Sequence, residues 1–453
     1  MKLIFRFSLI ICFFYSSSQA KDLNEILAST YETNPVLKAS REKLKATDEQ
    51  IMQSVARWLP NVTLSKQKRF IKQGRSSTSA KAQREGVSGA LNITQNLFRG
   101  GSDVATVKMA KAIIAQERAS LLSKEQEILI SAVDIYMKML QAEEEYKISE
   151  EQLEDSKLLV EFANRRFEGG EGTKTDVSQA KASLAEAHSG IISASSNLEI
   201  LKSKFLEITG TDPSKLTEPT QEINLPQSLD QAIEGAMSNS PEIIFAKNQM
   251  IQSSHNIDKV RGEKLLPSID LRHSIQDERK DNQAGYGGTV SGALNSMTVV
   301  SITIPVFDGG ASWSQYRQAK RTSQQSKYDL SNVSNEVITA TTQAWRGYEA
   351  KKYILEARKE ELESSRIAYL GMRKEEKAGL RSIGDVIIAR NTYFNSYRKM
   401  LNAKSDYVAS RYVIAAKIGE CTAENLKLDV NVYDPLKNYN IIKLQPIGSY
   451  NPD

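Results

Sequence analysis

Two short segments decide the fold: Leu97-Phe98-Arg99-Gly100-Gly101 and Val306-Phe307-Asp308-Gly309-Gly310, which lie 209 positions apart. Each follows a stretch of alternating polar and apolar residues and precedes a long stretch without proline. Each is therefore expected to mark the point where a strand ends and a helix begins. We predict that the glycine pairs, Gly100-Gly101 and Gly309-Gly310, make these strand-to-helix turns.

The same offset of 209 positions recurs further along the chain. Asp176-Val177 follows Gly170 at the spacing at which Asp385-Val386 follows Gly379. Internal similarity at one fixed spacing indicates a tandem duplication. We therefore predict two structural repeats and a C-terminal tail, at 21–219, 220–428 and 429–453.

Period-two alternation predicts two strands in each repeat. Leu91 and Ile93 alternate with Asn92 and Thr94, and the second repeat shows the same pattern from Val300 onward. Each strand then has one apolar and one polar face. The predicted strands lie at about 61–72, 87–98, 268–277 and 296–307, separated by polar loops at about 72–86 and 277–295. Pro305, inside the last strand, is expected to mark a bulge or an unpaired edge.

Helical periodicity follows each glycine pair. Ile114, Leu121, Ile128 and Ile135 recur every seven residues, which is typical of a coiled-coil seam. The long helices are predicted at about 102–169 and 311–378; Gly347 and Gly371 weaken the prediction that the second is unbroken. The return helices, at about 176–209 and 385–418, are half as long. We expect the helices that open the repeats, at about 22–58 and 228–265, to cover the remaining length, with breaks at Pro35 and Pro241.

The first twenty residues resemble a secretory signal peptide. Lys2 and Arg6 precede an apolar core, and Ser18-Gln19-Ala20 has the small-x-small pattern of a cleavage site. We predict a signal peptide at 1–20. A lipoprotein box ending at Cys12 is the alternative, which the bulky Ile11 disfavours.

The composition excludes several classes of protein. The formal net charge is +5 with 25% charged residues of both signs, which gives no electrostatic signature for nucleic acid. After position 20, Cys421 is the only cysteine, so the processed chain cannot form an internal disulfide. No later run of eighteen apolar residues predicts a membrane-spanning helix.

Four strands cannot close a barrel, because closure needs roughly eight or more. Several copies side by side would close one shared barrel, with the polar face toward water and the apolar face toward lipid. The predicted fold class is therefore mostly α with a membrane β-barrel portion, built from a duplicated unit of helix, β-hairpin and long helical hairpin.

The doubled glycine turns and the segment Gly-Leu-Arg-Ser-Ile-Gly-Asp-Val at 379–386 resemble the TolC-like outer membrane efflux proteins. The resemblance covers about 22–437, including the tail Val432-Tyr433-Asp434-Pro435. It implies a homotrimer whose twelve strands form one barrel in the outer membrane of a Gram-negative bacterium, in contact with outer-membrane lipid. An α-helical tunnel would extend from it into the periplasm.

The resemblance also implies function and partners. The trimer would passively conduct drugs or secreted proteins to the exterior, in drug efflux or type I secretion. The drugs or secreted proteins would reach the trimer from an inner-membrane RND or ABC transporter, through a periplasmic adaptor (membrane fusion) protein. No cofactor and no enzymatic activity are expected.

The resemblance places the periplasmic aperture gate at Arg381 and Asp385. Symmetry-related copies of Asp385 would form an acidic ring that favours cations, and their proximity would raise the pKa of the carboxyl groups. Two positions depart from the family pattern. Ile388 replaces a second acid, and Glu376 replaces an aromatic residue and is interpreted as restoring part of the lost charge.

The resemblance also implies that the helical tips contact the adaptor, and we predict this contact at Gly170, Thr173, Asp176, Gly379 and Ser382. The segments from Thr173 to Asp176 and from Ser382 to Asp385 also match a capping box, in which the acid simply caps a helix. The two roles are compatible.

Two other functions remain open from the residues alone. The chain could be a periplasmic or extracellular coiled-coil scaffold that self-associates through its hairpins, without channel activity. A hydrolase with helical insertions is disfavoured, because His188, His255 and His273 are scattered and Cys421 has no evident base. The histidines also lack metal-ligand spacing, so no metal site is predicted.

Overall fold

The computed structural model describes residues 21–73, 82–213, 215–219, 223–281 and 291–443. The predicted signal peptide and the central parts of both predicted strand loops lie outside these residues. The chain divides into two compact units. The first comprises Met1–Lys38, Lys124–Ala236 and Ala340–Val432, and the second comprises Ala39–Ser123, Met237–Thr339 and Tyr433–Asp453.

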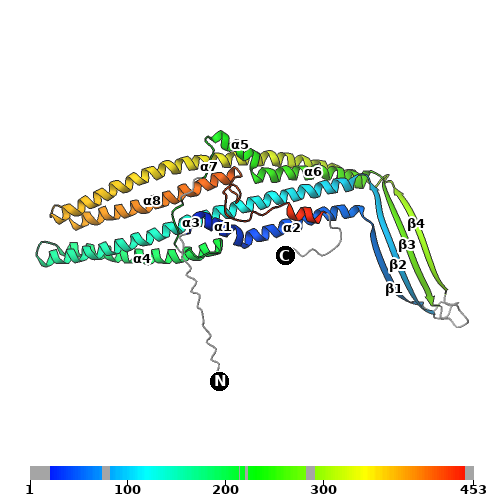
Figure 1. The fold of residues 1–453 in the computed structure, drawn as a ribbon, viewed down its shortest axis with the longest axis horizontal. Helices are drawn as coiled ribbons and strands as arrows, with labels where there is room; N and C mark the ends of the chain where they lie inside the picture. Colours follow the sequence, from blue (N-terminus) through cyan, green and yellow to red (C-terminus); the bar gives the residue numbers. More distant parts are fainter. Residues whose placement is uncertain (1–20, 74–81, 214, 220–222, 282–290, 444–453) are drawn as a thin grey trace, which may run out of the picture. The chain divides into compact units, whose positions relative to one another are not determined.

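A four-stranded antiparallel sheet belongs to the second unit. Its strands are β1 (Asn61–Gln73), β2 (Ala82–Arg99), β3 (Ser268–Asp281) and β4 (Ser291–Thr303), in the order β1-β2-β3-β4 (Figure 1). The central pairing of β2 with β3 joins the hairpins of the two predicted repeats. Within the described residues β1 and β4 each have one neighbouring strand, so both edges of the sheet are open there.

The register separates a polar face from an apolar face. Asn92 lies opposite Ser274, and Ile93 lies opposite His273. On the apolar face Leu64 is 83% exposed and Ile302 is 65% exposed, so large apolar side chains face outward from a single chain. Burial of this face therefore requires lipid or another chain.

The predicted end of the fourth strand, at about residue 307, was wrong. β4 stops at Thr303, so Pro305 follows the strand instead of lying within it. Proline has no backbone N–H to donate to a strand neighbour, which explains why the ladder ends before it. The irregularity in the sheet lies instead in β2, between Asn96 and Phe98.

The helices that open the repeats are broken at the predicted prolines. The first is divided into α1 (Leu23–Thr33) and α2 (Pro35–Val55), followed by the short helix η1 (Ala56–Trp58); the second is divided into α5 (Leu229–Asn239) and α6 (Pro241–Leu265). At the first break, Asn34 Oδ1 accepts the backbone N–H groups of Val36 and Leu37, at 2.9 and 3.2 Å. These bonds satisfy donors that the proline-led helix start leaves without intrahelical acceptors.

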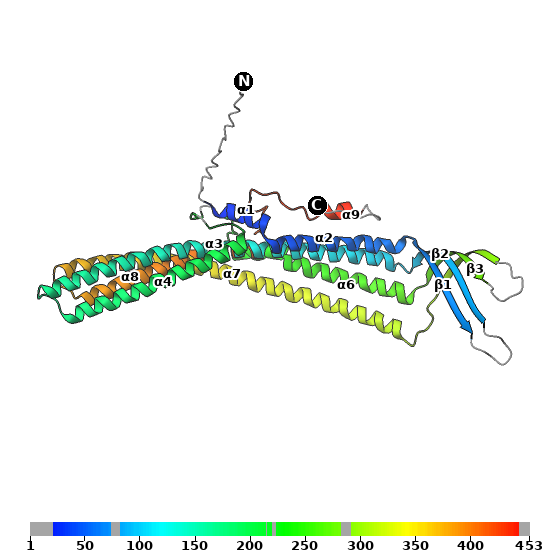
Figure 2. The same cartoon turned by 90° about the horizontal axis from the view of Figure 1, so that it is seen from below.

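Two helices of 67 residues follow the glycine turns: α3 (Ser102–Glu168) and α7 (Ala311–Lys377). The second is continuous through Gly347 and Gly371, which were expected to weaken it. The return helices are α4 (Lys174–Thr209) and α8 (Ile383–Lys417), which run alongside each other in the first unit (Figure 2). The seam residues of α3 are buried, including Ile114 at 1% and Ile135 at 4% exposure.

A short C-terminal helix, α9 (Lys437–Ile442), packs within the second unit. Ile442 joins Ile51 and Ile114 in one apolar cluster, and the Arg118 guanidinium lies 5.1 Å from the Tyr439 ring centroid. The tail thus contacts both α2 and α3. Among the helices of the described chain, none has the length and apolar character needed to cross a lipid bilayer.

Candidate functional site

Two helical tips close the long hairpins of the first unit. The first tip, residues 169–173, joins α3 to α4, and the second tip, residues 378–382, joins α7 to α8. Gly170 and Gly379 both have a φ of 77°, a left-handed conformation that favours glycine. The turn geometry therefore accounts for a glycine at both positions, whatever else the tips contact.

Both tips carry a capping box, so the capping interpretation is confirmed. At the first tip, Thr173 Oγ1 accepts the Asp176 N–H at 3.1 Å, and Asp176 Oδ2 accepts the Thr173 N–H at 3.0 Å. Ser382 and Asp385 make the same two bonds, both at 3.1 Å. Each box satisfies two backbone donors and fixes where the return helix begins.

The predicted gate residues lie together on the second tip. Arg381 Nε lies 3.0 Å from Glu375 Oε2, so this arginine forms an ion pair across its own turn, and it is about half exposed. The hydrogen bond from the Ser382 hydroxyl lowers the pKa of Asp385, and the Ser382 backbone N–H and the charge of Arg381 lower it further. A raised pKa from symmetry-related copies stays a prediction, since it depends on assembly.

Glu376 does not restore charge at the aperture, and that interpretation was wrong. Its side chain is 4% exposed, and its Oε1 lies 3.2 Å from Nη1 of Arg166 on α3. Burial raises the pKa of the Glu376 carboxyl group. Glu376 lies on the face of α7 that is directed toward α3. Ile388, at the other departure from the family pattern, is 67% exposed.

A buried arginine connects three helices next to the tips. Arg390 on α8 is 1% exposed, and its Nη1 and Nη2 donate to the hydroxyl groups of Ser156 on α3 and Ser183 on α4. Its Nε has no hydrogen-bond partner among the described residues. Burial lowers the pKa of the Arg390 guanidinium.

The sequence interpretation missed Arg390, although a signal was present. Ile383, Val386, Arg390 and Phe394 follow a helical spacing of three, four and four, and all four are buried. A charged residue inside an otherwise apolar stripe is unusual, because burial of a charge is costly unless the charge is paired. The stripe could therefore have identified Arg390 before the structure was known.

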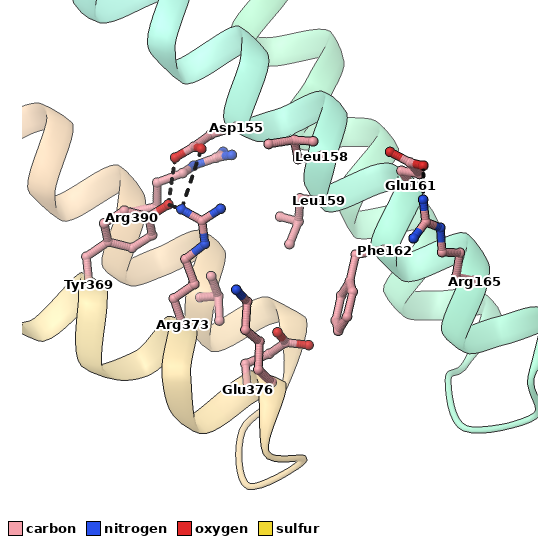
Figure 3. A pocket seen from close by; sticks show the side chains of 12 residues that line it. Asp155, Leu158, Leu159, Glu161, Phe162, Arg165, Tyr369, Arg373, Glu376 and Arg390 are labelled. Atoms are coloured by element: carbon pink, nitrogen blue, oxygen red, sulfur yellow. Dashed lines mark hydrogen bonds and ion pairs between the residues drawn. The ribbon is translucent and has the colours of Figure 1, made fainter.

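Asp155 on α3 forms a second polar link between the hairpins. It accepts the Tyr369 hydroxyl at 2.6 Å and pairs with Arg373 at 3.7 Å, both from α7 (Figure 3). Burial is the main cause that raises the pKa of Tyr369, and the bond to Asp155 adds to it. Ile383 completes the contact by packing with Ala163 and Ala180. The two hairpins are thus joined by buried polar and apolar contacts within one chain.

The glycine pairs lie in the second unit, between strand and helix. Gly100 and Gly101 separate β2 from α3 with φ values of 57° and 77°. Gly309 and Gly310, just before α7, have φ values of 71° and 87°. Gly100 also lies very close to α6, since a Cβ atom at this position would lie 2.6 Å from the Gly262 carbonyl oxygen.

The described residues contain no group of three or more His, Cys, Asp or Glu side chains that could hold a metal ion. Cys421 is fully buried, and burial raises the pKa of its thiol to about 12, so the reactive thiolate is strongly disfavoured. The contacts that the described residues make at the tips are charge pairing and helix capping.

Comparison with known proteins identifies one family. A family model described as outer membrane efflux protein matches residues 26–210 and 232–420. The outer membrane efflux protein BepC of Brucella suis is 28% identical over 435 residues, covering 96% of this chain and 93% of BepC. Outer membrane protein TolC of Escherichia coli is 22% identical, covering 91% of this chain and 85% of TolC.

The fold also matches a solved structure. The crystal structure of the Campylobacter jejuni CmeC outer membrane channel aligns with a TM-score of 0.76 at 17% identity. The alignment covers 94% of this chain and 89% of CmeC. The likeness at this identity concerns the fold alone.

Proposed function

Because the chain belongs to the outer membrane efflux protein family, we propose that three copies assemble into one closed conduit. The protein is an export channel of the Gram-negative outer membrane. The observation that carries the trimer is the four-stranded sheet with two open edges. Three such sheets, joined β4 to β1, supply twelve strands, enough to close a barrel.

The two faces of the sheet support this assembly. Leu64, Val300 and Ile302 are largely exposed on the apolar face and would be buried against lipid. Asn92, Thr94 and Ser274 occupy the opposite face and would line an aqueous lumen. A coiled-coil scaffold without channel activity would have no comparable use for a sheet with one polar and one apolar face.

The tips are proposed to form the periplasmic aperture. Arg381 and Asp385 lie on the second tip, where threefold symmetry would bring the copies of Asp385 together. An adaptor is proposed to contact Gly170, Thr173, Asp176, Gly379 and Ser382. An inner-membrane RND or ABC transporter would supply the energy that moves drugs or secreted proteins into the conduit. The conduit itself is proposed to have no enzymatic activity.

Export is proposed to remove residues 1–20, with the mature chain beginning at Lys21. The Lys21 N–H donates to the Lys215 carbonyl at 3.1 Å, and the Lys21 carbonyl accepts the hydroxyl of buried Tyr136 at 3.1 Å. These bonds hold the proposed new N-terminus in the first unit. The two repeats, 21–219 and 220–428, and the tail 429–453 remain our proposed organisation of the mature chain.

Native mass spectrometry of the complex extracted from outer membranes tests the assembly. A mass of three chains, together with a gel band that dissociates only on heating, is the expected result. A monomer recovered in the soluble fraction would instead support the scaffold function.

A further inference from the structure

A cavity of about 280 Å³ lies in the first unit between α3 and α7, next to the tips (Figure 3). Its apolar lining consists of Leu158, Leu159, Phe162 and Val386. The volume is near the lower end of the range of ligand sites, about 300–1,000 Å³. The cavity could therefore accept only a small organic molecule.

The charged lining has more cations than anions. Four basic side chains and three carboxylates line the cavity: Arg165, Arg373, Lys377, Arg390, Asp155, Glu161 and Glu376. Each carboxylate already forms an ion pair, Glu161 with Arg165, Asp155 with Arg373, and Glu376 with Arg166. Among the described residues, Lys377 and Arg390 form no ion pair. The lining therefore carries an excess of positive charge.

Arg390 is the unusual member of this set. Its guanidinium is buried with two serine hydroxyl groups as acceptors, while Nε has no acceptor among the described residues. Most buried polar groups are hydrogen-bonded, and a buried cation without a direct ion pair is costly. The carboxylates of Asp155 and Glu186 act on Arg390 through their charge without forming an ion pair with it. A bound carboxylate supplies the missing acceptor for Nε and a negative charge in direct contact, since its two oxygens match the geometry of a guanidinium.

We propose that this cavity binds a small organic carboxylate. The carboxylate is directed toward Arg390 and Lys377, and the apolar body packs against Phe162 and Leu159. All lining residues belong to one chain, so the site does not depend on the proposed trimer. A bound acid contacts α3, α7 and α8 together, and it stabilises their packing by mass action.

Isothermal titration calorimetry on the detergent-solubilised full chain tests the proposal with a matched pair of ligands. 3-Phenylpropionate and its neutral amide, 3-phenylpropanamide, have the same apolar body and differ in the charge of the head group. The acid is expected to bind at least about tenfold more tightly than the amide, because charge-assisted hydrogen bonds are about twice as strong as neutral ones. Equal affinities, or no binding of the acid, would overturn the proposal.

Two pairs of variants locate the site. Arg390→Met should weaken binding of the acid about tenfold, whereas Arg366→Met, which alters an exposed arginine on α7 outside the lining, should leave it unchanged. Lys377→Gln should weaken binding about threefold, and Lys374→Gln, on the same helix but outside the lining, serves as its control. The lysine pair keeps the test decisive if Arg390→Met fails to fold. Equal effects in variant and control would place binding elsewhere and contradict the proposal.

Native mass spectrometry of the same samples reports the oligomeric state. A chain that binds the acid but is not trimeric would contradict the proposed assembly and support this site. A trimer that does not bind the acid would contradict this site but not the proposed assembly.

Discussion

Nη1 of Arg390 on α8 donates to Oγ of Ser156 on α3 at 2.9 Å, at a position where the arginine is 1% exposed. Ser156 Oγ also donates to the Gln152 carbonyl at 2.7 Å, so the hydroxyl keeps a partner if the arginine is removed. The guanidinium thus joins the two hairpins while remaining a buried charge without an ion-pair partner among the described residues.

Substitutions at Arg390 should separate the packing of this side chain from its charge. Arg390→Ala leaves a cavity and should reduce the free energy of unfolding by about 2–4 kcal/mol. Arg390→Met fills most of the space and removes the buried charge, so it should stay within about 1 kcal/mol of the wild type or exceed it. Chemical denaturation, monitored by hydrogen exchange in the first unit, measures the free energy of unfolding of both variants. A methionine variant as unstable as the alanine variant would show that the charge itself holds the hairpins together.

The buried Glu376 should make stability depend on pH. Its folded-state pKa is raised, so the folded state binds a proton more tightly than the unfolded state does. The contribution of Glu376 to stability is therefore fully present below the ordinary pKa of 4.5 and is lost as the pH rises through the higher folded-state pKa. Melting temperatures of the wild type and Glu376→Gln between about pH 4 and 8 should show this loss in the wild type and a flatter curve in the variant. Parallel curves would exclude Glu376 as the source.

Asp385 should act both as a helix cap and as the proposed aperture charge, and two substitutions distinguish these roles. Asp385→Asn keeps an oxygen acceptor for the Ser382 N–H and removes the charge, so block of the channel by multivalent cations should weaken with little loss of stability. Ser382→Ala removes a cap and should cost about 1 kcal/mol at the tip while leaving cation block intact. Planar-bilayer recordings and hydrogen exchange over 382–386 provide the two measurements. Unchanged block in Asp385→Asn would leave only the capping role.

Arg381 pairs with Glu375 across the second tip, and it is proposed to help hold the aperture closed. Arg381→Ser should raise the conductance of the resting channel in planar bilayers. Lys374→Ser, another exposed basic residue near the same turn, is the control. Equal conductance of Arg381→Ser and the wild type would remove Arg381 from the gate.

Two adjacent glycines allow a matched test of the strand-to-helix turn. Gly100→Ala places a Cβ atom 2.6 Å from the Gly262 carbonyl oxygen at a φ of 57°, whereas Gly101→Ala meets no atom within 4 Å at a φ of 77°. Gly101→Ala should therefore cost only the backbone strain, about 1–2 kcal/mol. Gly100→Ala should cost more, because the backbone of α6 must also move. Thermal unfolding of both variants gives the comparison, and equal losses would show that the contact with Gly262 relaxes freely.

Periodicity in the sequence was enough to predict the strands, the long helices and the breaks at Pro35 and Pro241, because these depend on local pattern and backbone chemistry. The end of β4 was misplaced because apolar alternation continues to Val306, although Pro305 cannot extend the ladder. Glu376 was misinterpreted because its role depends on which face of α7 meets α3. Spacing within one helix does not give that pairing. The burial of Arg390 could have been predicted from the apolar stripe on its own helix. Its two serine partners could not, because they lie on two other helices.

The central claim is that copies of this chain form a conduit through the outer membrane. Single-channel recording from the purified complex in planar bilayers tests it most directly. The account predicts discrete conductance steps from a complex whose mass is that of three chains, with block by multivalent cations that depends on Asp385. The absence of conductance steps in bilayers exposed to a folded complex of that mass would contradict the account.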